Sequence, residues 1–200
     1  MGSLGGRAAQ VYRARFGAAK WKEHVRGVGG LWRGIQERLV SLKLDFSRLR
    51  LYQDGLPVCG KEAEIVRDLA ARGSPNHQLI AGLMDLGARL EGTEDVELLL
   101  REYELAKCQL AQVHGRAAGG GQAVEDAQTI LRERDYFIAR RIGETLGGNE
   151  TGLLFLGLAH EVPSYLPQDI AVQFLIHRLP FKKYAEPVCI SHPVYRKARP

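Results

Sequence analysis

Apolar residues recur along the chain with two different periods, and each period predicts a different element. Over residues 11–39 they return every three or four positions, which is the period of an amphipathic helix. The three glycines within residues 27–30 predict that this stretch is broken into two helices. Over residues 48–54 apolar and polar residues alternate instead, a pattern typical of a half-buried strand.

Downstream of that strand the sequence predicts an alternation of helices and short strands. Ser74 followed by Pro75 is a favoured start for a helix, and Thr93 is predicted to cap a longer one. The glycine-rich residues 114–122 predict a flexible linker, and residues 163–169 a short helix or turn. Helices are predicted over residues 62–72, 75–87, 94–110 and 123–146, and strands over residues 88–91, 153–160 and 171–176.

This order of elements predicts an α/β fold in which helix dominates, with a small, mostly parallel sheet and flanking helices. A chain of 200 residues is a suitable length for one domain. We therefore expect a single α/β domain over residues 1–180, with a helical N-terminal part over residues 1–45. Residues 181–200 are expected to form a basic C-terminal tail.

Composition narrows the class of protein. Hydrophobic residues make up 45% of the chain, which is enough to bury a core, but no run of 18 apolar residues predicts a membrane span. The N-terminal residues lack the pattern of a signal peptide. Cys59, Cys108 and Cys189 form no C-x-x-C pair, which argues against a disulfide framework or a zinc ribbon. We therefore expect a cytoplasmic protein with no membrane partner.

The formal net charge of +5 raises the question of a nucleic-acid partner. A basic tail can bind phosphate groups, but no aromatic stacking pattern or recognised nucleic-acid motif accompanies this one. We interpret the tail as a solvated terminus and rank nucleic-acid binding below the other functions. The basic residues concerned are Arg178, Lys182, Lys183, Arg196, Lys197 and Arg199.

Residues 153–160 carry the clearest chemical signal. Four apolar residues, then Gly157, then His160 predict a buried strand that delivers an imidazole to its carboxyl end. Ligands bind at this edge of α/β sheets, and a histidine there suits metal binding or proton transfer. A turn histidine without a chemical role is the alternative interpretation.

Two acidic residues follow the earlier predicted strands, Asp54 after the first and Glu94 after the second. If the strands are parallel neighbours, Asp54, Glu94 and His160 face the same edge of the sheet. Glu94 and His160 would then bind a divalent metal or act as a base and its orienting partner. Each acidic residue also has an interpretation without function. The helix dipole favours Glu94 in a first helical turn, and Asp54 before Gly55 fits a turn.

Arg134 lies in a strongly charged part of the predicted helix 123–146. Most of this charge is interpreted as a solvated face, but an arginine turned inward would bind a carboxylate or phosphate with two hydrogen bonds. His77 lies at a helix start, where packing or capping accounts for it. The chain lacks the G-x-S-x-G, P-loop and H-E-x-x-H motifs, which argues against the enzymes that depend on them.

Three segments in this order resemble motifs of the TraB / erythromycin-esterase-like / ChaN-like superfamily, which includes the Tiki metalloproteases. Gly92-Thr93-Glu94 resembles its Gly-x-Glu segment, Glu133-Arg134-Asp135 its arginine helix, and residues 154–160 its second Gly-x-x-His motif. The resemblance covers about residues 85–165. It implies a metal-dependent hydrolase in which His160 and Glu94 hold a divalent metal or activate water. Arg134 would orient a carboxylate or stabilise negative charge, and Asp54 would be a fourth catalytic member.

The chain departs from that superfamily in lacking the first Gly-x-x-His, because a helical stretch stands where the family begins with a strand. A truncated N-terminus is one expected reason. The alternative is a non-catalytic ligand-binding or protein-interaction module of the same fold. For the enzyme we expect a small-molecule or peptide substrate. An incomplete sheet would expose a strand edge, so a homo-oligomer stays open as well.

Overall fold

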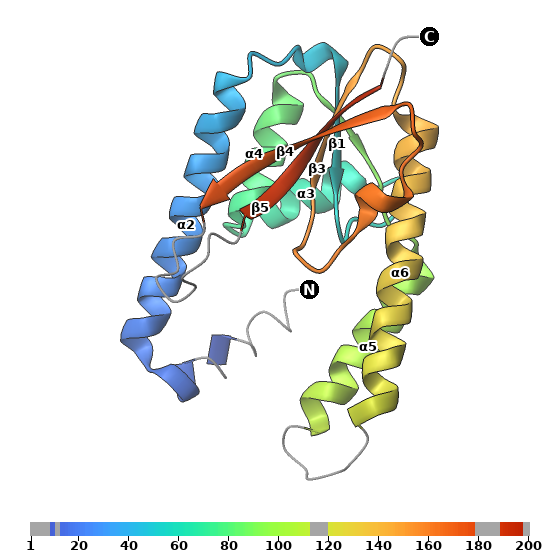
Figure 1. Ribbon diagram of the computed structural model, residues 1–200. Coiled ribbons are helices and arrows are strands. Elements are labelled where there is room, and N and C mark those ends of the chain that lie inside the picture. Colours follow the sequence, from blue (N-terminus) through green and yellow to red (C-terminus); the bar gives the residue numbers. More distant parts are fainter. Residues whose placement is uncertain (1–8, 11–12, 113–119, 179–188, 198–200) are drawn as a thin grey trace. The chain divides into compact units, whose positions relative to one another are not determined.

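The computed structural model describes residues 9–10, 13–112, 120–178 and 189–197 (Figure 1). The chain divides into two compact units. One comprises Met1–Lys43 with Leu175–Ser191, and the other comprises Leu44–Phe174 with His192–Pro200.

The first unit contains α2 (Ala18–Ser41), one helix of 24 residues. The prediction of two helices here was wrong, because the three glycines within residues 27–30 lie inside α2. A glycine in a helix interior costs only about 0.5–1 kcal/mol. The apolar face continues past the glycines to Ile35 and Leu39, which are buried, and this burial holds the helix together.

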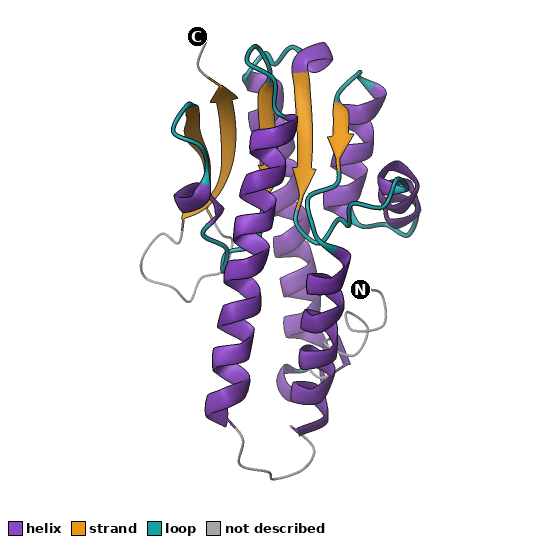
Figure 2. Ribbon diagram, turned by 90° about the vertical axis from the view of Figure 1, so that its right-hand side faces the viewer, coloured by secondary structure: helices purple, strands orange, loops and turns teal. Residues whose placement is uncertain are grey.

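Three parallel strands form the centre of the second unit. β1 (Leu49–Gln53) lies between β2 (Arg89–Glu91) and β3 (Thr151–Phe155) and pairs in parallel with both. The full sheet has the order β2-β1-β3-β5-β4, and β5 runs antiparallel to β3. β4 spans Ile170–Arg178 and β5 spans Cys189–Lys197. The predicted helix-rich α/β fold with a small, mostly parallel sheet is thus confirmed (Figure 2).

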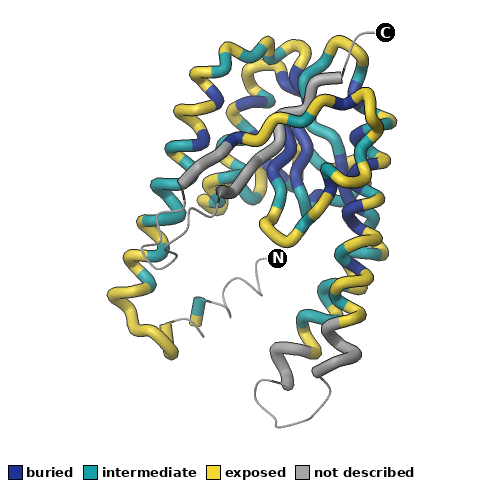
Figure 3. The backbone as a smooth tube through the Cα atoms, viewed as in Figure 1, coloured by how far each residue is buried: buried dark blue, intermediate teal, exposed yellow. Residues whose placement is uncertain are grey.

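β1 is more deeply buried than its alternating sequence predicted. Leu49, Leu51, Tyr52 and Gln53 are all buried, although neighbouring residues of a strand point to opposite faces. Both faces of this central strand are therefore covered, as is usual for parallel sheets. Figure 3 shows the buried positions gathered on the parallel strands and on the part of α6 that packs beside them.

Helices pack in pairs around this sheet. α3 (Glu62–Ala71) packs against α4 (Pro75–Asp85), and α5 (Val96–Gln112) packs against α6 (Gly120–Thr145). The pair of α5 and α6 extends beyond the carboxyl ends of the parallel strands (Figure 2). Two short 3-10 helices, η1 (Phe46–Arg48) and η2 (Val162–Tyr165), complete the unit.

One hydrophobic cluster fixes α6 to the sheet. Ile138, Ala139 and Ile142 of α6 are buried with Tyr52 of β1 and Leu154 of β3. The side chains on α6 recur at intervals of three and four, so one face of the helix is held against the strands. This packing also sets where the polar residues one turn earlier on α6 lie.

Two predictions about strands need correction. β3 ends at Phe155 and does not run on to His160, because a turn closed by the hydrogen bond from the His160 N–H to the Gly157 carbonyl follows it. Residues 189–197 of the predicted tail form β5, whose sequence pattern is interrupted at residues 191–193. Of the predicted linker, residues 113–119 lie outside the described part, and α6 already begins at Gly120.

Across the described ranges, no helix combines the length and the apolar character that a membrane span requires.

Candidate functional site

The carboxyl ends of β1 and β3 bring two distant loops together. Gln53 and Phe155 are paired in register, and the Asp54 N–H donates to the Phe155 carbonyl at 3.0 Å, so the pairing continues one residue beyond β1. Asp54 then starts the loop after β1, and residues 156–161 form the loop after β3. Two of the predicted site residues, Asp54 and His160, are therefore neighbours.

His160 is held by a carboxylate on α6. Its Nδ1 is hydrogen-bonded to Oδ1 of Asp135, and the other carboxylate oxygen accepts the Glu161 N–H at 2.7 Å. Asp135 is only 2% exposed, so these two contacts replace water at its charge. With a proton on Nδ1 directed at the carboxylate, the neutral imidazole keeps a lone pair on Nε2.

Asp54 faces the free nitrogen of this histidine. Its Oδ2 lies 3.8 Å from Nε2 of His160 and accepts the Gly157 N–H at 2.8 Å. Its Oδ1 accepts from Nε2 of Gln53 at 2.6 Å. Burial raises the pKa of Asp54, and the Gly157 N–H and His160 only partly oppose this shift. The Asp54 side chain nevertheless keeps 25% of its surface exposed, whereas the His160 side chain is 5% exposed.

Gly157 allows this close approach of the two loops. A Cβ atom at position 157 would lie 3.1 Å from Oδ2 of Asp54 and 3.5 Å from Cδ2 of His160. A larger residue would push the carboxylate away from the backbone N–H that binds it. The glycine of the predicted Gly-x-x-His segment thus has a steric role as well as its place in the turn.

Glu94 and Arg134 form a buried ion pair instead of an open site. Arg134 donates from Nη2 to Oε1 of Glu94 at 2.6 Å and from Nε to Oε2 at 3.1 Å. Its Nη1 donates to Glu102 of α5 at 2.6 Å. Burial works to lower the pKa of Arg134, but the hydrogen bond and charge of Glu94 outweigh it and the pKa is raised. The inward arginine that we considered is present, and its carboxylate partner belongs to this chain.

The loop before α5 differs from the prediction. Glu94 precedes α5 and forms an isolated parallel bridge with Pro57, so the helix-dipole interpretation of Glu94 was wrong. The cap is Asp95, whose Oδ1 accepts the N–H groups of Glu97 and Leu98. Thr93 instead donates its hydroxyl to the Gln53 carbonyl, which ties this loop to the end of β1.

The residues present do not fit a metal held by His160 and Glu94. The Glu94 carboxylate already accepts from Arg134 and, at 3.0 Å, from the Gly55 N–H. Among the residues whose placement is described, no group of three or more His, Cys, Asp or Glu side chains is arranged to hold a metal ion. A divalent metal elsewhere in the chain stays an untested prediction, and the chemistry below uses no step through a metal.

Sequence reasoning did not select Asp135 as a site residue. The available signal was its position on α6, three and seven residues before the buried Ile138 and Ile142. That spacing places a carboxylate on the buried face of a helix, where a charged group needs a partner. Gln53, which is buried at the end of β1, was not selected either.

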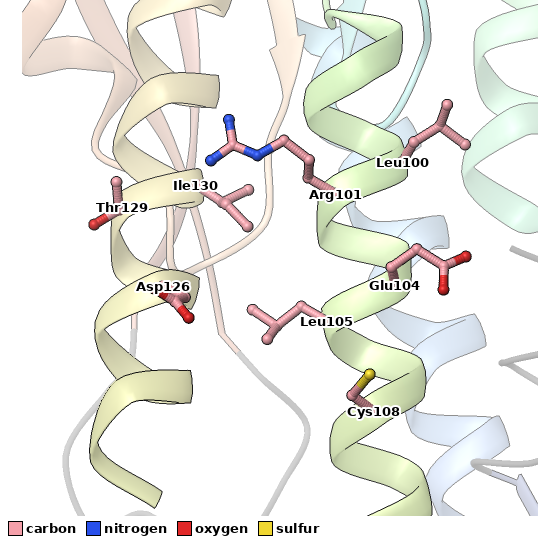
Figure 4. Close-up of a pocket in the computed structure, with 8 residues that line it drawn as sticks. All are labelled: Leu100, Arg101, Glu104, Leu105, Cys108, Asp126, Thr129 and Ile130. Atoms are coloured by element: carbon pink, nitrogen blue, oxygen red, sulfur yellow. The ribbon is translucent and has the colours of Figure 1, made fainter. Parts of the chain in front are cut away.

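A cavity of about 520 Å³ lies elsewhere in the second unit, between α5 and α6 (Figure 4). Its apolar lining comes from Leu100, Leu105 and Ile130, and Cys108 and Arg101 also border it. None of the residues at the strand ends contributes to it. The cavity and the cluster around His160 are separate features.

The chain matches no protein-family model, no curated protein and no solved structure.

Proposed function

We propose that the protein is a hydrolase in which His160 is the general base. The observation that carries the proposal is the imidazole hydrogen-bonded to the Asp135 carboxylate at Nδ1 and faced by the carboxyl group of Asp54 3.8 Å from Nε2, at the carboxyl edge of a parallel sheet. A buried carboxylate on one imidazole nitrogen fixes the tautomer and stabilises the imidazolium that forms when the other nitrogen takes a proton.

In the proposed reaction His160 starts without its second proton and acts as the base, and Asp54 starts with a proton and acts as the acid. Nε2 of neutral His160 takes a proton from water, and the water oxygen bonds to the carbonyl carbon of an ester or amide. As the bond from that carbon to the leaving group breaks, protonated Asp54 donates its proton to the leaving oxygen or nitrogen. The proton on His160 then passes to Asp54, which restores both groups. The raised pKa of Asp54 supports its role as the acid.

In this proposal Glu94 and Arg134 are positioning residues. Their ion pair holds the loop after β2 against α6, one residue before Asp135. The resemblance of this region to the TraB superfamily is part of the proposal, since it also implies hydrolysis. The substrate is proposed to be a small molecule or peptide that carries an ester or amide bond.

The test replaces the base by a residue that can hydrogen-bond but cannot take a proton. Hydrolysis of p-nitrophenyl acetate and of a peptidyl p-nitroanilide is measured for wild type, His160→Gln and the control His24→Ala in α2. We expect kcat/KM to fall on the order of 100-fold or more in His160→Gln and to stay unchanged in the control. Wild-type rates in a folded His160→Gln protein would refute the proposal, as would no turnover by wild type above buffer.

Metal content belongs to the same test. Elemental mass spectrometry of wild type and His160→Gln, both purified without a His tag, reports any metal held by His160. Near-stoichiometric metal that is lost in the variant would make the proposed hydrolase metal-dependent. Its absence from both proteins, even after reconstitution, would leave the carboxylate–histidine mechanism alone.

A second candidate function is a non-catalytic binding module. The observation that favours it is the cavity between α5 and α6, which lies apart from His160 and has an apolar lining. In this case an apolar small molecule would occupy the cavity. Leu105→Arg would then abolish binding of the fluorescent apolar probe ANS, while His160→Gln would not change it.

A further inference from the structure

The side-chain amide of Gln53 has one possible orientation at the end of β1. Its Nε2 donates to the main-chain carbonyl of Asp54 at 2.9 Å and to Oδ1 of the Asp54 carboxyl group at 2.6 Å. A main-chain carbonyl can only accept a hydrogen bond, whatever the pH. The nitrogen end of the amide therefore always faces Asp54. Gln53 is only 6% exposed, so little water competes for these two contacts.

Asn76 at the start of α4 holds the other end of this amide. Its Nδ2 donates to Oε1 of Gln53 at 3.3 Å. Its Oδ1 accepts the Ser74 hydroxyl at 2.7 Å and lies 3.0 Å from Nδ1 of His77. An amide oxygen can only accept a hydrogen bond, so Nδ1 of His77 carries a proton and donates it. Two donors at the start of α4 thus fix the orientation of Asn76.

Ser74 is part of this network and does not cap α4. It occupies the N-cap position, but its side chain makes no capping hydrogen bond. Its Oγ lies 2.8 Å from Nδ1 of His77 and accepts a share of the proton on that nitrogen, while the hydroxyl proton of Ser74 is donated to Asn76. Every hydrogen bond in the network therefore runs in the same direction, from the start of α4 towards Asp54.

The network determines which oxygen of Asp54 faces His160. With Oδ1 bound to Gln53, Oδ2 is the oxygen that accepts the Gly157 N–H at 2.8 Å and lies 3.8 Å from Nε2 of His160. The side chain itself restricts rotation of an aspartate carboxyl group only weakly. Here N–H donors on the two oxygens restrict that rotation. Without Gln53, the Gly157 N–H is the one hydrogen bond to the carboxyl group that remains within the described part of the chain.

We infer that Gln53 and Asn76 are positioning residues that hold the Asp54 carboxyl group with Oδ2 towards His160. The inference rests on the proposed function, in which Asp54 gives a proton to the leaving group and regains one from His160. A fixed Oδ2 keeps both transfers at one atom beside the imidazole. The orientation of the carboxyl group exists without turnover, so it can be tested whether or not the protein is a hydrolase.

The experiment is a pH titration of the full chain by nuclear magnetic resonance. It follows the side-chain amide signals of Gln53 and Asn76 and the carboxyl carbon of Asp54. Each signal is assigned by its loss in Gln53→Met, Asn76→Leu or Asp54→Asn. We expect the Gln53 amide signal to move with the same midpoint as the Asp54 carboxyl carbon, because Nε2 donates to that carboxyl group. The Asn76 amide signal should move with the same midpoint and a smaller amplitude, because it is one hydrogen bond further away.

Two variants test whether these contacts act on Asp54. Gln53→Met keeps most of the side-chain volume but removes the donor to Oδ1, and the loss of a donor to the charged form raises the pKa of a carboxyl group. Asp54 should therefore titrate at higher pH in Gln53→Met, and should shift in the same direction by less in Asn76→Leu. Gln78→Met is the matched control. Gln78 is an exposed residue of α4 that donates to the Ala70 carbonyl, so Asp54 should titrate there as in wild type.

Three results would overturn the inference. The first is a Gln53 amide signal in wild type that does not follow the titration of Asp54, which decides the matter even if a variant fails to fold. The second is the same Asp54 pKa in folded Gln53→Met as in Gln78→Met. The third is an unchanged kcat in Gln53→Met for p-nitrophenyl acetate, since kcat should fall on the order of 10-fold or more with little change in KM. If wild type does not hydrolyse this ester, the proposed function fails and the titration alone decides the positioning role, so the two failures give different results.

Discussion

Removal of Arg134 tests whether Glu94 is a buried structural charge. In Arg134→Met the apolar volume is largely kept, but the guanidinium that donates to both oxygens of Glu94 is lost. Glu94 is 0% exposed, so water cannot take the place of the guanidinium. Within the described part of the chain, the hydrogen bond from the Gly55 N–H at 3.0 Å is the one that would still bind its carboxylate. The variant therefore leaves one nearly unpartnered charge in the interior.

The expected loss is large because the charge is buried. Breaking a buried ion pair by removing one partner costs about 3–5 kcal/mol of unfolding free energy. Glu102 adds little to this loss, since its side chain is 44% exposed and water can solvate it. Arg134→Met combined with Glu94→Met removes both charges, and such apolar replacements are often close to neutral. Most of the lost stability should therefore return in the double variant.

Urea unfolding followed by circular dichroism measures these differences. Arg101→Met is the matched control, because Arg101 also joins α5 to α6 by an ion pair, with Glu133, but both side chains are about half exposed. The control should lose at most about 1 kcal/mol. The structural role of this pair is refuted if Arg134→Met is no more destabilising than the control. It is also refuted if the double variant loses as much unfolding free energy as Arg134→Met and Glu94→Met lose when added together.

Two further predictions concern Asp54 and the loop at Gly92. Because the pKa of Asp54 is raised in the folded state, the folded protein holds more protons than the unfolded chain above the ordinary value of 3.8, and Asp54 lowers stability as pH rises. Asn cannot accept from both the Gly157 N–H and Nε2 of Gln53, so Asp54→Asn loses one contact at every pH. The stability of Asp54→Asn relative to wild type should therefore rise between pH 3.8 and pH 7, as urea unfolding across this range would show; an equal difference at both pH values would contradict it. Gly92→Ala should lose about 1–3 kcal/mol by thermal unfolding, since its Cβ would lie 2.8 Å from Cα of Val58. Gly82→Ala in α4 has open space and should gain about 0.5–1 kcal/mol; a loss there would refute the steric reasoning.

The sequence predicted some elements well because their signals are local. The period of apolar residues identified α3, α4 and α6, and the alternation at β1 identified a strand. β5 was missed because its pairing partner, β3, is about 40 residues away and its own pattern is weak. The glycines of α2 were given too much weight, because each costs a helix only about 0.5–1 kcal/mol and the apolar spacing continues past them to the buried Ile35 and Leu39.

For the candidate site too, the local signals were predicted and the contacts between distant residues were not. The sequence alone was enough to select the candidate residues. Polar residues that follow apolar runs are visible in the sequence, and these gave Asp54, Glu94 and His160. The charged part of a predicted helix gave Arg134. The sequence could not show which of these residues contact one another. The structure pairs Glu94 with Arg134 and leaves Asp54 beside His160, whereas the sequence pattern had joined Glu94 to His160.

What the sequence determined by itself was the α/β character, the small parallel sheet and the edge at which polar groups gather. These follow from the periods of apolar residues and from the rule that parallel strands end on one side. Only the tertiary structure decided that Asp135 holds His160 and that Ser74 meets His77 instead of capping α4. A hydrogen bond depends on a few tenths of an ångström and on direction, and packing between distant segments sets both.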